Sequence, residues 1–504
     1  MRRSGIFPGA AGAIVVGLIF LLAPPARAQQ PPAFTVTFGG EMRVHGILFD
    51  NMTDFTDTEP DGKGGSAFKD SNSHYFQRWR LRTTVESADK KAKAHWALEV
   101  GDIVWGAGGG ASGGEFTGTS TRVGPGTGGQ LGNDGVNVET KNLYVQFDIP
   151  FVPGANLLLG LHNIIFLESP IGAFMDDDAA GIQFNWKLDP VRLQLWTAKA
   201  DENNRQDADD VDFYVGRLML DITKDLRVSV EGLLVNQQCF AKKSVTTTTV
   251  VPGPTAGSPA TTGTTTARTG ACVDADIGDT YWVGGTVSAK IATVQLDGTV
   301  VYGQRALFSD TLDRNIDESG WGAQVTARVP IGPLSTWWNG WYTTGDENRI
   351  VGSKASKFRS PGTGQDFSTN SPTTKLNADS DKLPIPIAST SWLGAPFQSE
   401  FVLGIRTLGV PFVGSSLYLD PTGTWGVGGS AIYALTPAVS VGGGVGYVAA
   451  IEDNGIFGDN VIEVDGGLTY AYNPNLGFQL IAGYLIPDEG DDAWAAMFRT
   501  RFAF

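Results

Sequence analysis

Apolar and polar residues alternate along most of the chain beyond its first thirty residues. Stretches of about 10 to 14 residues follow a period of two, which places one face of an extended strand in an apolar medium and the other face in a polar one. Between residues 75 and 86, for example, Trp79 and Leu81 take odd positions, while Arg78, Arg80 and Arg82 take even ones. No comparable stretch has a helical period, so the pattern predicts an all-β protein.

The connections between these stretches fall into two classes that alternate along the chain. Short turns, such as 87–90 and 473–475, separate long connections rich in Gly, Asp, Ser and Thr. The longest connections cover about 50–73, 106–135, 238–278 and 348–421. Short turns on one side and long loops on the other are typical of an outer-membrane barrel. A soluble β-sandwich has no reason to sort its loops in this way.

This rule predicts about 18 strands, within a range of 16 to 20, and an even number returns both ends of the chain to the short-turn side. The strands are expected near 34–49, 74–87, 92–105, 137–149, 155–167, 180–188, 191–200, 211–222, 226–237, 280–291, 293–305, 319–330, 334–346, 422–435, 438–450, 461–473, 476–486 and 493–504. Two alternatives stay open for 348–421: residues 401–408 and 412–419 form a further hairpin, or they belong to a loop folded into the lumen.

A lipid environment explains the alternation better than water does. Every backbone N–H and C=O must be paired inside a membrane, so only helices and closed barrels cross it. Strands of ~9 to 11 residues suffice for the hydrocarbon thickness. A soluble barrel of this size would enclose a core too wide for side chains to fill. We therefore predict a transmembrane antiparallel β-barrel with short periplasmic turns, long extracellular loops and a water-filled lumen.

The first 28 residues have the features of an export signal. Arg2 and Arg3 precede an apolar run over 10–23, and Ala26-Arg27-Ala28 before Gln29 fits a cleavage site. The alternative is a retained signal anchor, but Pro24 and Pro25 interrupt the run. The expected organisation is a signal peptide at 1–28 and one barrel domain at 29–504. The 504 residues would otherwise suggest about three soluble domains.

Composition and charge narrow the function classes. The formal net charge is -16, and it becomes -19 when Arg2, Arg3 and Arg27 leave with the signal peptide. A chain this acidic does not have the basic surface that nucleic-acid binding needs. The apolar content of 41% argues against disorder, and the 66 glycines have no collagen period. Most of the negative charge falls in the predicted loops.

Two cysteines flank the Thr-rich connection. Cys239 and Cys272 are the only cysteines in a chain predicted to be exported, so the simplest prediction is one disulfide at the base of this loop. A metal or redox pair would need C-x-x-C spacing or nearby His, and neither is present. The stretch 245–269 between them is expected not to fold on its own.

The last residues fit a closing amphipathic strand. Trp494, Phe498, Phe502 and Phe504 share one parity, and Arg499 and Arg501 take the other. An aromatic C-terminal residue on such a strand resembles the signal that the assembly machinery of bacterial outer membranes reads. The alternative is an ordinary final strand.

Several stretches resemble a known group of proteins. Residues 40–46, 75–87, 142–150 and 157–163 are similar to bacterial porin-type barrels, including the alginate-export-like group. The resemblance implies an 18-stranded barrel whose Arg-rich wall faces an anionic solute, and it places that role on Arg78, Arg80 and Arg82. The chain departs from this group in its cysteine-flanked loop and in 348–421.

Parity assigns a set of charged residues to the lumen. Rings of Arg favour anions in a pore because a low-dielectric wall focuses their field. The alternative is that these Arg residues pair with lumenal carboxylates and hold the wall together, and both roles can coexist. The predicted pore-lining residues are Arg43, Arg78, Arg80, Arg82, Arg192, Arg217, Arg227, Arg328, Arg499, Arg501, Glu41, Glu86 and Glu231.

The remaining motifs point away from catalysis and cofactors. Four scattered His residues accompany no metalloprotease, hydrolase or phosphate-binding motif, so we predict neither an enzyme nor a bound cofactor or metal. Acidic runs at 176–178, 207–210 and 488–492 are either divalent-cation sites or solvated loop tips, and the lack of EF-hand spacing favours loop tips.

The predicted function is an outer-membrane porin for passive diffusion of small polar solutes, including anionic ones. The alternatives are an alginate-type polysaccharide export channel and a structural or surface-binding barrel plugged by its own loops. Outer-membrane lipid is the expected surrounding. The Gly-rich lipid face near 442–446 also allows packing into a homo-oligomer.

Overall fold

The computed structural model describes thirteen ranges of the chain. These are residues 34–50, 72–105, 138–169, 172–201, 211–237, 245–251, 261–267, 280–309, 314–344, 354–356, 424–451, 460–488 and 491–504. The predicted signal peptide, both cysteines, the acidic run at 207–210 and the possible hairpin at 401–419 lie outside these ranges. The predictions made for them stay predictions.

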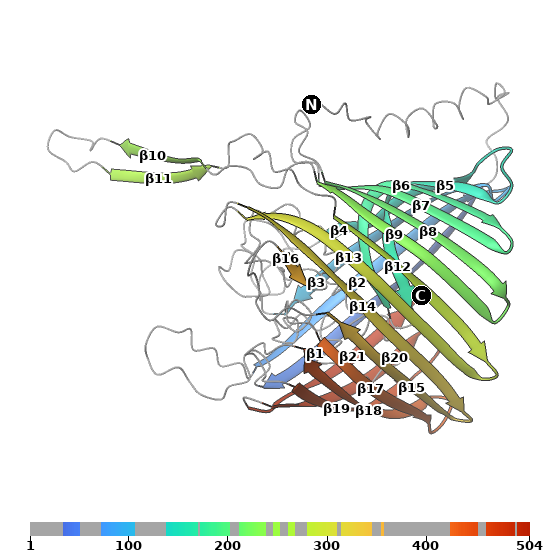
Figure 1. Cartoon of the computed structure of the whole chain (residues 1–504). Coiled ribbons are helices and arrows are strands. Elements are labelled where there is room, and N and C mark those ends of the chain that lie inside the picture. Colours follow the sequence, from blue (N-terminus) through green and yellow to red (C-terminus); the bar gives the residue numbers. More distant parts are fainter. Residues whose placement is uncertain are drawn as a thin grey trace.

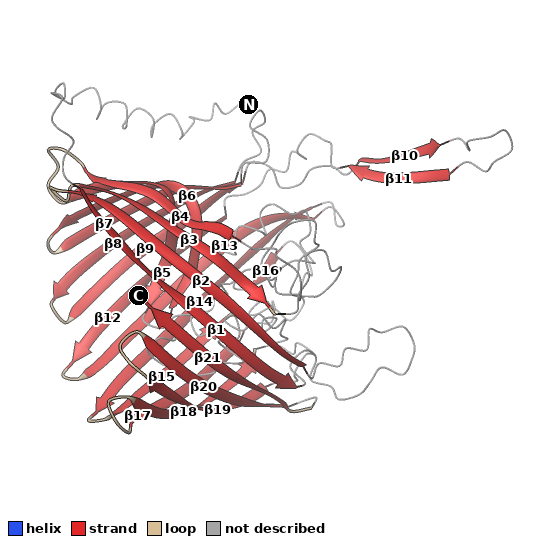
Figure 2. Ribbon diagram, turned by 180° about the vertical axis from the view of Figure 1, so that it is seen from behind, coloured by secondary structure: helices blue, strands red, loops and turns tan. Residues whose placement is uncertain are grey.

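Eighteen strands form the wall of one closed antiparallel barrel (Figures 1 and 2), which confirms the predicted fold class and strand number. Each strand pairs with its neighbours along the chain. The wall strands are β1 (Phe34–Asp50), β2 (Asn72–Ser87), β3 (Ala92–Val104), β4 (Val138–Asp148), β5 (Ala155–Ser169), β6 (Gly172–Leu188), β7 (Val191–Asp201), β8 (Val211–Thr223), β9 (Leu226–Gln237), β12 (Thr280–Ile291), β13 (Val294–Ser309), β14 (Arg314–Ile331), β15 (Leu334–Thr343), β17 (Thr424–Ala434), β18 (Val439–Ala450), β19 (Asn460–Ala471), β20 (Leu476–Pro487) and β21 (Ala493–Ala503).

The first and last strands close the barrel. The ladder between β1 and β21 runs from Glu41 opposite Ala503 to Asp50 opposite Trp494. At the rim, the Gly40 N–H donates to the Phe504 carbonyl at 2.9 Å, and the Phe504 N–H donates back at 3.1 Å. Both edges of the sheet are thereby paired.

Two connections contain strands that were expected to be loops. In the Thr-rich connection, β10 (Val245–Val251) and β11 (Thr261–Ala267) form a separate two-stranded sheet. The prediction that this stretch does not fold was wrong because Thr and Val are β-branched and favour extended, paired backbone. Within 348–421, β16 (Lys354–Ser356) pairs in parallel with Asp317–Ser319 of β14.

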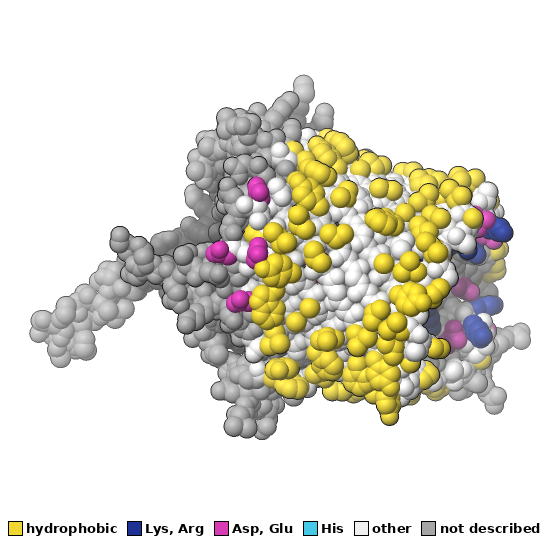
Figure 3. All heavy atoms as spheres, turned by 90° about the horizontal axis from the view of Figure 1, so that it is seen from below, with side chains coloured by type: hydrophobic (Ala, Val, Ile, Leu, Met, Phe, Trp, Pro, Cys, Tyr) yellow, Lys and Arg dark blue, Asp and Glu magenta, His cyan; other side chains and the backbone are white. Residues whose placement is uncertain are grey.

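The outer face of the wall is apolar. Large hydrophobic side chains at alternate positions are exposed around the whole barrel, among them Val300, Val325 and Val427. In Figure 3, apolar side chains surround a central area of backbone and uncharged side chains on the visible side of the wall, and charged side chains lie only along its two edges. Exposed apolar area on this scale is not found on soluble monomers. The wall is therefore a lipid-facing surface.

Aromatic pairs border this apolar belt at both ends of the strands. Near the long connections, the rings of Tyr75 and Trp105 lie 5.4 Å apart, and those of Trp321 and Tyr342 lie 4.8 Å apart. Near the short turns, Phe502 and Phe504 stack at 6.1 Å. Girdles of this kind mark the two membrane interfaces of outer-membrane barrels.

The short turns all lie at one rim (Figure 2) and are built from local hydrogen bonds. In the turn from β2 to β3, the Ser87 hydroxyl donates to Asp89 Oδ1 at 2.7 Å, and the Lys91 N–H donates to the same oxygen at 3.2 Å. The hydrogen bond from Ser87 is the main reason that the pKa of the Asp89 carboxyl lies below its ordinary value.

A β-bulge in β3 breaks the simple parity of the sequence. The register with β2 shifts between Gln77 and Trp79, and Gly101 at this point has a φ of 121°. Odd residues of β3 therefore face the lumen before the bulge, as His95 does, and face outward after it, as Trp105 does. A bulge of this kind adds one residue to a strand and cannot be read from alternation alone.

Gly101→Ala is expected to lower the free energy of unfolding by about 1–3 kcal/mol, because a side chain is strained at positive φ. The added Cβ would also lie 2.6 Å from the Gln77 carbonyl oxygen. Heat-modifiable gel migration and tryptophan fluorescence in urea would measure the loss. Gly298→Ala is the matched control because its Cβ would lie 3.9 Å from the nearest atom. Equal losses in both variants would contradict the strain at Gly101.

Candidate functional site

One side of the lumen is rich in arginine. We call this surface the arginine face, and it lies on β21, β1 and β2, with the neighbouring carboxylates on β1, β2 and β3. Strand register places Arg43 opposite Arg501 on one side and opposite Arg78 on the other, so three guanidinium groups share one row. The arginine face comprises Arg43, Arg78, Arg80, Arg82, Arg499 and Arg501, with Glu41, Glu86 and Glu99 as its carboxylates.

Two of these glutamates each hold two arginines. Glu41 Oε2 lies 2.8 Å from Arg501 Nη2, and Glu41 Oε1 lies 3.2 Å from Arg43 Nε. On the other side of the row, Glu99 contacts Arg80 and lies 3.6 Å from Arg78. The six arginines outnumber the three glutamates, so these strands keep a positive excess even though like charges in one row oppose each other.

Arg82 differs from its neighbours on the arginine face. It is exposed, and it makes no ion pair with any residue in the described ranges. The residues opposite it are Gly39 on β1 and Ala97 on β3, neither of which carries a polar side chain. Its charge is therefore available to a solute in the lumen.

The hairpin of β5 and β6 leaves the wall and turns into the lumen. β5 pairs with β4 only as far as Leu161, and β6 pairs with β7 only from Ala180 onward. Between these points, the two strands pair only with each other, and the end of β5 contacts β9, β12 and β13 instead. We call residues 162–169 and 172–179 the inward hairpin. The strands predicted at 155–167 and 180–188 left 168–178 to a connection, whereas β5 extends to Ser169 and β6 begins at Gly172.

An apolar cluster holds the inward hairpin against the wall. Ile164, Phe166 and Leu167 are fully buried, and Leu167 lies against Gly284 of β12. These side chains pack on lumen-facing residues of five wall strands, which are Trp196, Ala198, Phe213, Val215, Leu233, Val235, Trp282 and Val301. Full burial of a large apolar side chain contributes ~1.5–3 kcal/mol, so the inward position of this hairpin is built into the fold.

A buried ion pair fixes the backbone of the same segment. Arg217 Nε lies 3.0 Å from Glu231 Oε2, and the two residues are 6% and 3% exposed. The Leu167 N–H donates to that Glu231 oxygen at 2.7 Å, and Arg217 Nη2 donates to the Ile165 carbonyl at 3.1 Å. Arg217 also lies over the Trp196 ring at 5.4 Å. Both charges were predicted to line the pore, but they lie beneath the hairpin.

An amide ladder continues from this ion pair across the inner wall. Arg217 Nη1 donates to Gln194, whose amide nitrogen donates to Asn185 at 3.0 Å. Asn185 in turn donates to Asn156, and Gln146 donates to the same Asn156 oxygen. These residues come from five adjacent strands, so the ladder is a continuous polar strip on the lumenal surface.

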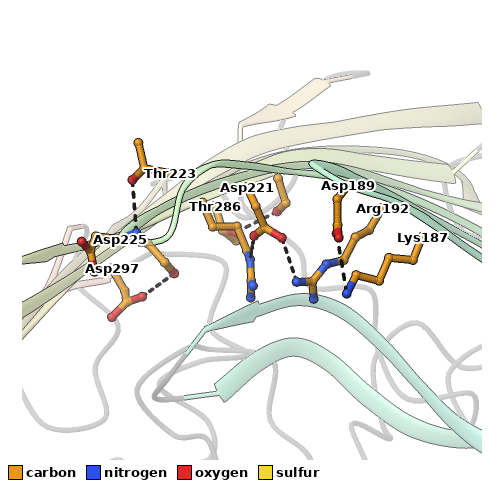
Figure 4. Close-up of polar contacts among 11 residues, drawn as sticks. Lys187, Asp189, Arg192, Asp221, Thr223, Asp225, Thr286 and Asp297 are labelled. Atoms are coloured by element: carbon orange, nitrogen blue, oxygen red, sulfur yellow. Dashed lines mark hydrogen bonds and ion pairs between the residues drawn. The ribbon is translucent and has the colours of Figure 1, made fainter.

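Near the short-turn rim, a second ion-pair network crosses the wall (Figure 4). Asp221 accepts from Arg192 Nη2 at 2.7 Å and from Arg227 Nε at 2.6 Å. Next to it, the Ser288 hydroxyl donates to Asp297 at 2.5 Å. These two arginines were predicted to line the pore, and the structure shows that they share one carboxylate.

The remaining predicted residues take part in none of the ion pairs described above. Arg328 on β14 is exposed, and its guanidinium lies 4.9 Å from the centre of the Trp337 ring. Glu86 lies near the short-turn end of β2. The acidic run at 176–178 belongs to β6 rather than to a loop, and its Asp178 pairs with Lys141 at 3.0 Å.

Within the described ranges, no group of three or more His, Cys, Asp or Glu side chains is placed to hold a metal ion. No helix of this part of the chain is long and apolar enough to cross a membrane.

His95, Tyr144 and His162 come together on the adjacent strands β3, β4 and β5, and the His95 ring is stacked on the Tyr144 ring at 5.1 Å.

Comparisons with known proteins find similarity only among solved structures. No protein-family model and no curated protein matches the chain. OpdK of Pseudomonas aeruginosa, solved with vanillate, is 9% identical with a TM-score of 0.48, and OpdL of the same species is 9% identical with a TM-score of 0.49. Each alignment covers 93% of this chain and 98% of the other.

OccAB4 of Acinetobacter baumannii is 11% identical with a TM-score of 0.46, over 94% of this chain and 100% of the other. OpdK is described as an outer membrane protein. Similarity at this level carries no information about the solute of this chain. The resemblance to the alginate-export-like group finds no support in these comparisons.

Proposed function

We propose that the protein is an outer-membrane channel for passive diffusion of small polar solutes, with a preference for anions. The observation that carries this proposal is the arginine face, where six guanidinium groups face a wide lumen with only three carboxylates beside them. A low-dielectric wall focuses such a field across the pore and concentrates counter-ions. The apolar belt and its aromatic borders support the membrane location.

The inward hairpin supports a selective channel rather than an open one. It occupies part of the lumen at the level of the buried ion pair, so a solute passes between the hairpin and the opposite wall. The arginine face and the amide ladder offer hydrogen-bond donors to an oxygen-bearing solute along this route. An alginate-type exporter would need a path wide enough for a polymer, which the inward hairpin makes less favourable.

Planar-bilayer recording with the purified, folded protein tests the proposal. Discrete conductance steps are expected, and in a KCl gradient the reversal potential should shift toward that of chloride. A heat-denatured sample is the control for adventitious leaks. Absence of steps would contradict the channel and favour the alternative of a barrel plugged by its own loops. A reversal potential near that of potassium would contradict the anion preference alone.

We also propose two partners of the barrel, which are the assembly machinery of the outer membrane and further copies of the same chain. The assembly machinery of the outer membrane is expected to recognise β21 together with Phe504, which follows it and is 48% exposed. A homo-oligomer is the other expectation, and native gels of the detergent-solubilised protein would measure its size.

A further inference from the structure

A groove crosses the lipid-facing side of the wall, far from the arginine face. It has a volume of about 580 Å³ and runs over β14, β15, β17, β18 and β19. Almost all of its surface is apolar, and no charged residue lines it. The groove lies in the apolar belt and reaches toward the ends of the strands that bear the long connections, where the Tyr447 ring lies 5.3 Å from the Trp425 ring. It is therefore continuous with the surface that faces lipid.

Small residues in the wall create the groove. Gly340 and Gly429 leave its floor without side chains, between the walls formed by Trp338 and Tyr447. The Trp338 ring lies flat over Gly429, where an added Cβ would be 2.8 Å from the ring carbons. Although 57% exposed, Trp338 donates its indole N–H to Thr336 Oγ1 at 3.3 Å. Its one polar group is thus paired within the protein, as contact with hydrocarbon requires.

The shape of the groove corresponds to a single extended chain. Strand register aligns Val325, Gly340, Val427, Tyr447 and Ile462 in one row across the five strands. Four spacings of ~4.8 Å give a length of about 19 Å. With strands tilted ~45°, that row rises about 13 Å through the membrane, close to the half-thickness of a ~30 Å hydrocarbon core.

We propose that this groove binds one acyl chain of a bilayer lipid. The bound lipid exchanges more slowly than the other lipids around the barrel. Dispersion contacts favour a linear hydrocarbon that fills the concave surface, because an unfilled groove would lose those contacts. A second copy of the chain suits this surface less well. In an isologous contact, the same concave patch would face itself and leave a void.

Photo-crosslinking tests the proposal. The folded protein is placed in phosphatidylethanolamine vesicles that contain a diazirine on the acyl chain, and labelled residues are mapped by peptide mass spectrometry. Labelling of Trp338, Val427 and Tyr447 is expected to exceed that of the remaining lipid-facing belt several-fold. Uniform labelling around the barrel would overturn the proposal. Protein-to-protein crosslinks at these residues would indicate a second copy and would also overturn it.

Variants sharpen the test. Gly340→Leu fills the groove without a backbone clash, because its Cβ would meet its neighbours at 3.6–4.0 Å, and it should abolish the excess labelling. Gly216→Leu makes the same change on the lipid face of β8, away from the groove, where the added Cβ would meet only Leu195 at 3.7 Å, and it should leave the excess unchanged. Trp338→Ala removes a wall and should lower labelling of Val427. Heat-modifiable migration confirms that each variant is folded, and loss of excess labelling in Gly216→Leu as well would overturn the proposal.

Discussion

Glu231→Ala is expected to lower both the single-channel conductance and the stability of the barrel. The substitution removes the acceptor of the Leu167 N–H and leaves the Arg217 guanidinium buried beneath the inward hairpin without its carboxylate. Breaking a buried ion pair by removing one partner costs ~3–5 kcal/mol. The hairpin relieves that cost by detaching from the wall, which admits water to Arg217 and moves the hairpin further into the solute path. Single-channel recording and thermal unfolding would measure the two effects.

Two further variants separate the roles of charge and hydrogen bonding. Glu231→Gln keeps an acceptor for the Leu167 N–H and is expected to change the conductance less than alanine does. Glu86→Ala removes a lumenal carboxylate away from the hairpin, and its conductance should stay near that of the unchanged protein. If Glu231→Ala folds and conducts as the unchanged protein does, the ion pair does not hold the hairpin in place.

Reversing two charges on the arginine face is expected to reverse the ion preference of the channel. In the double variant Arg82→Glu and Arg499→Glu, the six arginines and three glutamates become four and five. The ion pairs of Glu41 and Glu99 are kept in this variant, and the hydrogen bond of 2.6 Å that Arg499 donates to Gln479 is lost, so most of the polar contacts of this wall should remain. The reversal potential in a KCl gradient would measure the change. The change in reversal potential should be smaller at 1 M salt, where the Debye length falls to ~3 Å.

The matched control changes the same amount of charge outside the lumen. Lys90→Glu and Lys224→Glu alter two exposed residues in the short turns, and they are expected to leave the ion preference in place. If this control shifts the reversal potential as far as the lumenal pair does, the net charge of the protein determines selectivity rather than the arginine face.

Alternation was sufficient to predict the barrel because the two faces of each wall strand contact different media. Lipid on one side and a polar lumen on the other impose a period of two on the wall strands, so the fold class and the strand number followed from the sequence. Strand register places Arg78, Arg80 and Arg82 on one face of β2, and their role in lining the pore stays a prediction. The bulge at Gly101 is a local exception, because one added residue exchanges the two faces of β3 without a distinct sequence pattern.

The inward hairpin could not be predicted in the same way. Residues 164–167 are apolar without alternation and 176–178 are acidic, so the sequence favoured a loop here. The hairpin turns inward because it contacts strands far along the chain. Trp196, Phe213 and Trp282 take lumenal positions that a water-filled pore would not favour, and these three apolar residues were the available signal. Parity also placed Arg217 and Glu231 in the lumen, but burial of the pair depends on the hairpin that covers them.

The ladder between β1 and β21 has a consequence for the biogenesis of the protein. These strands are about 450 residues apart in the chain, so their pairing is among the most non-local contacts a single domain can contain, and such contacts form slowly. A chain that lacks β21 would present the unpaired edges of β1 and β20 to lipid, where no water can satisfy their backbone groups. Closure of the barrel therefore depends on the strand that is synthesised last, and a chain without β21 is not expected to insert stably.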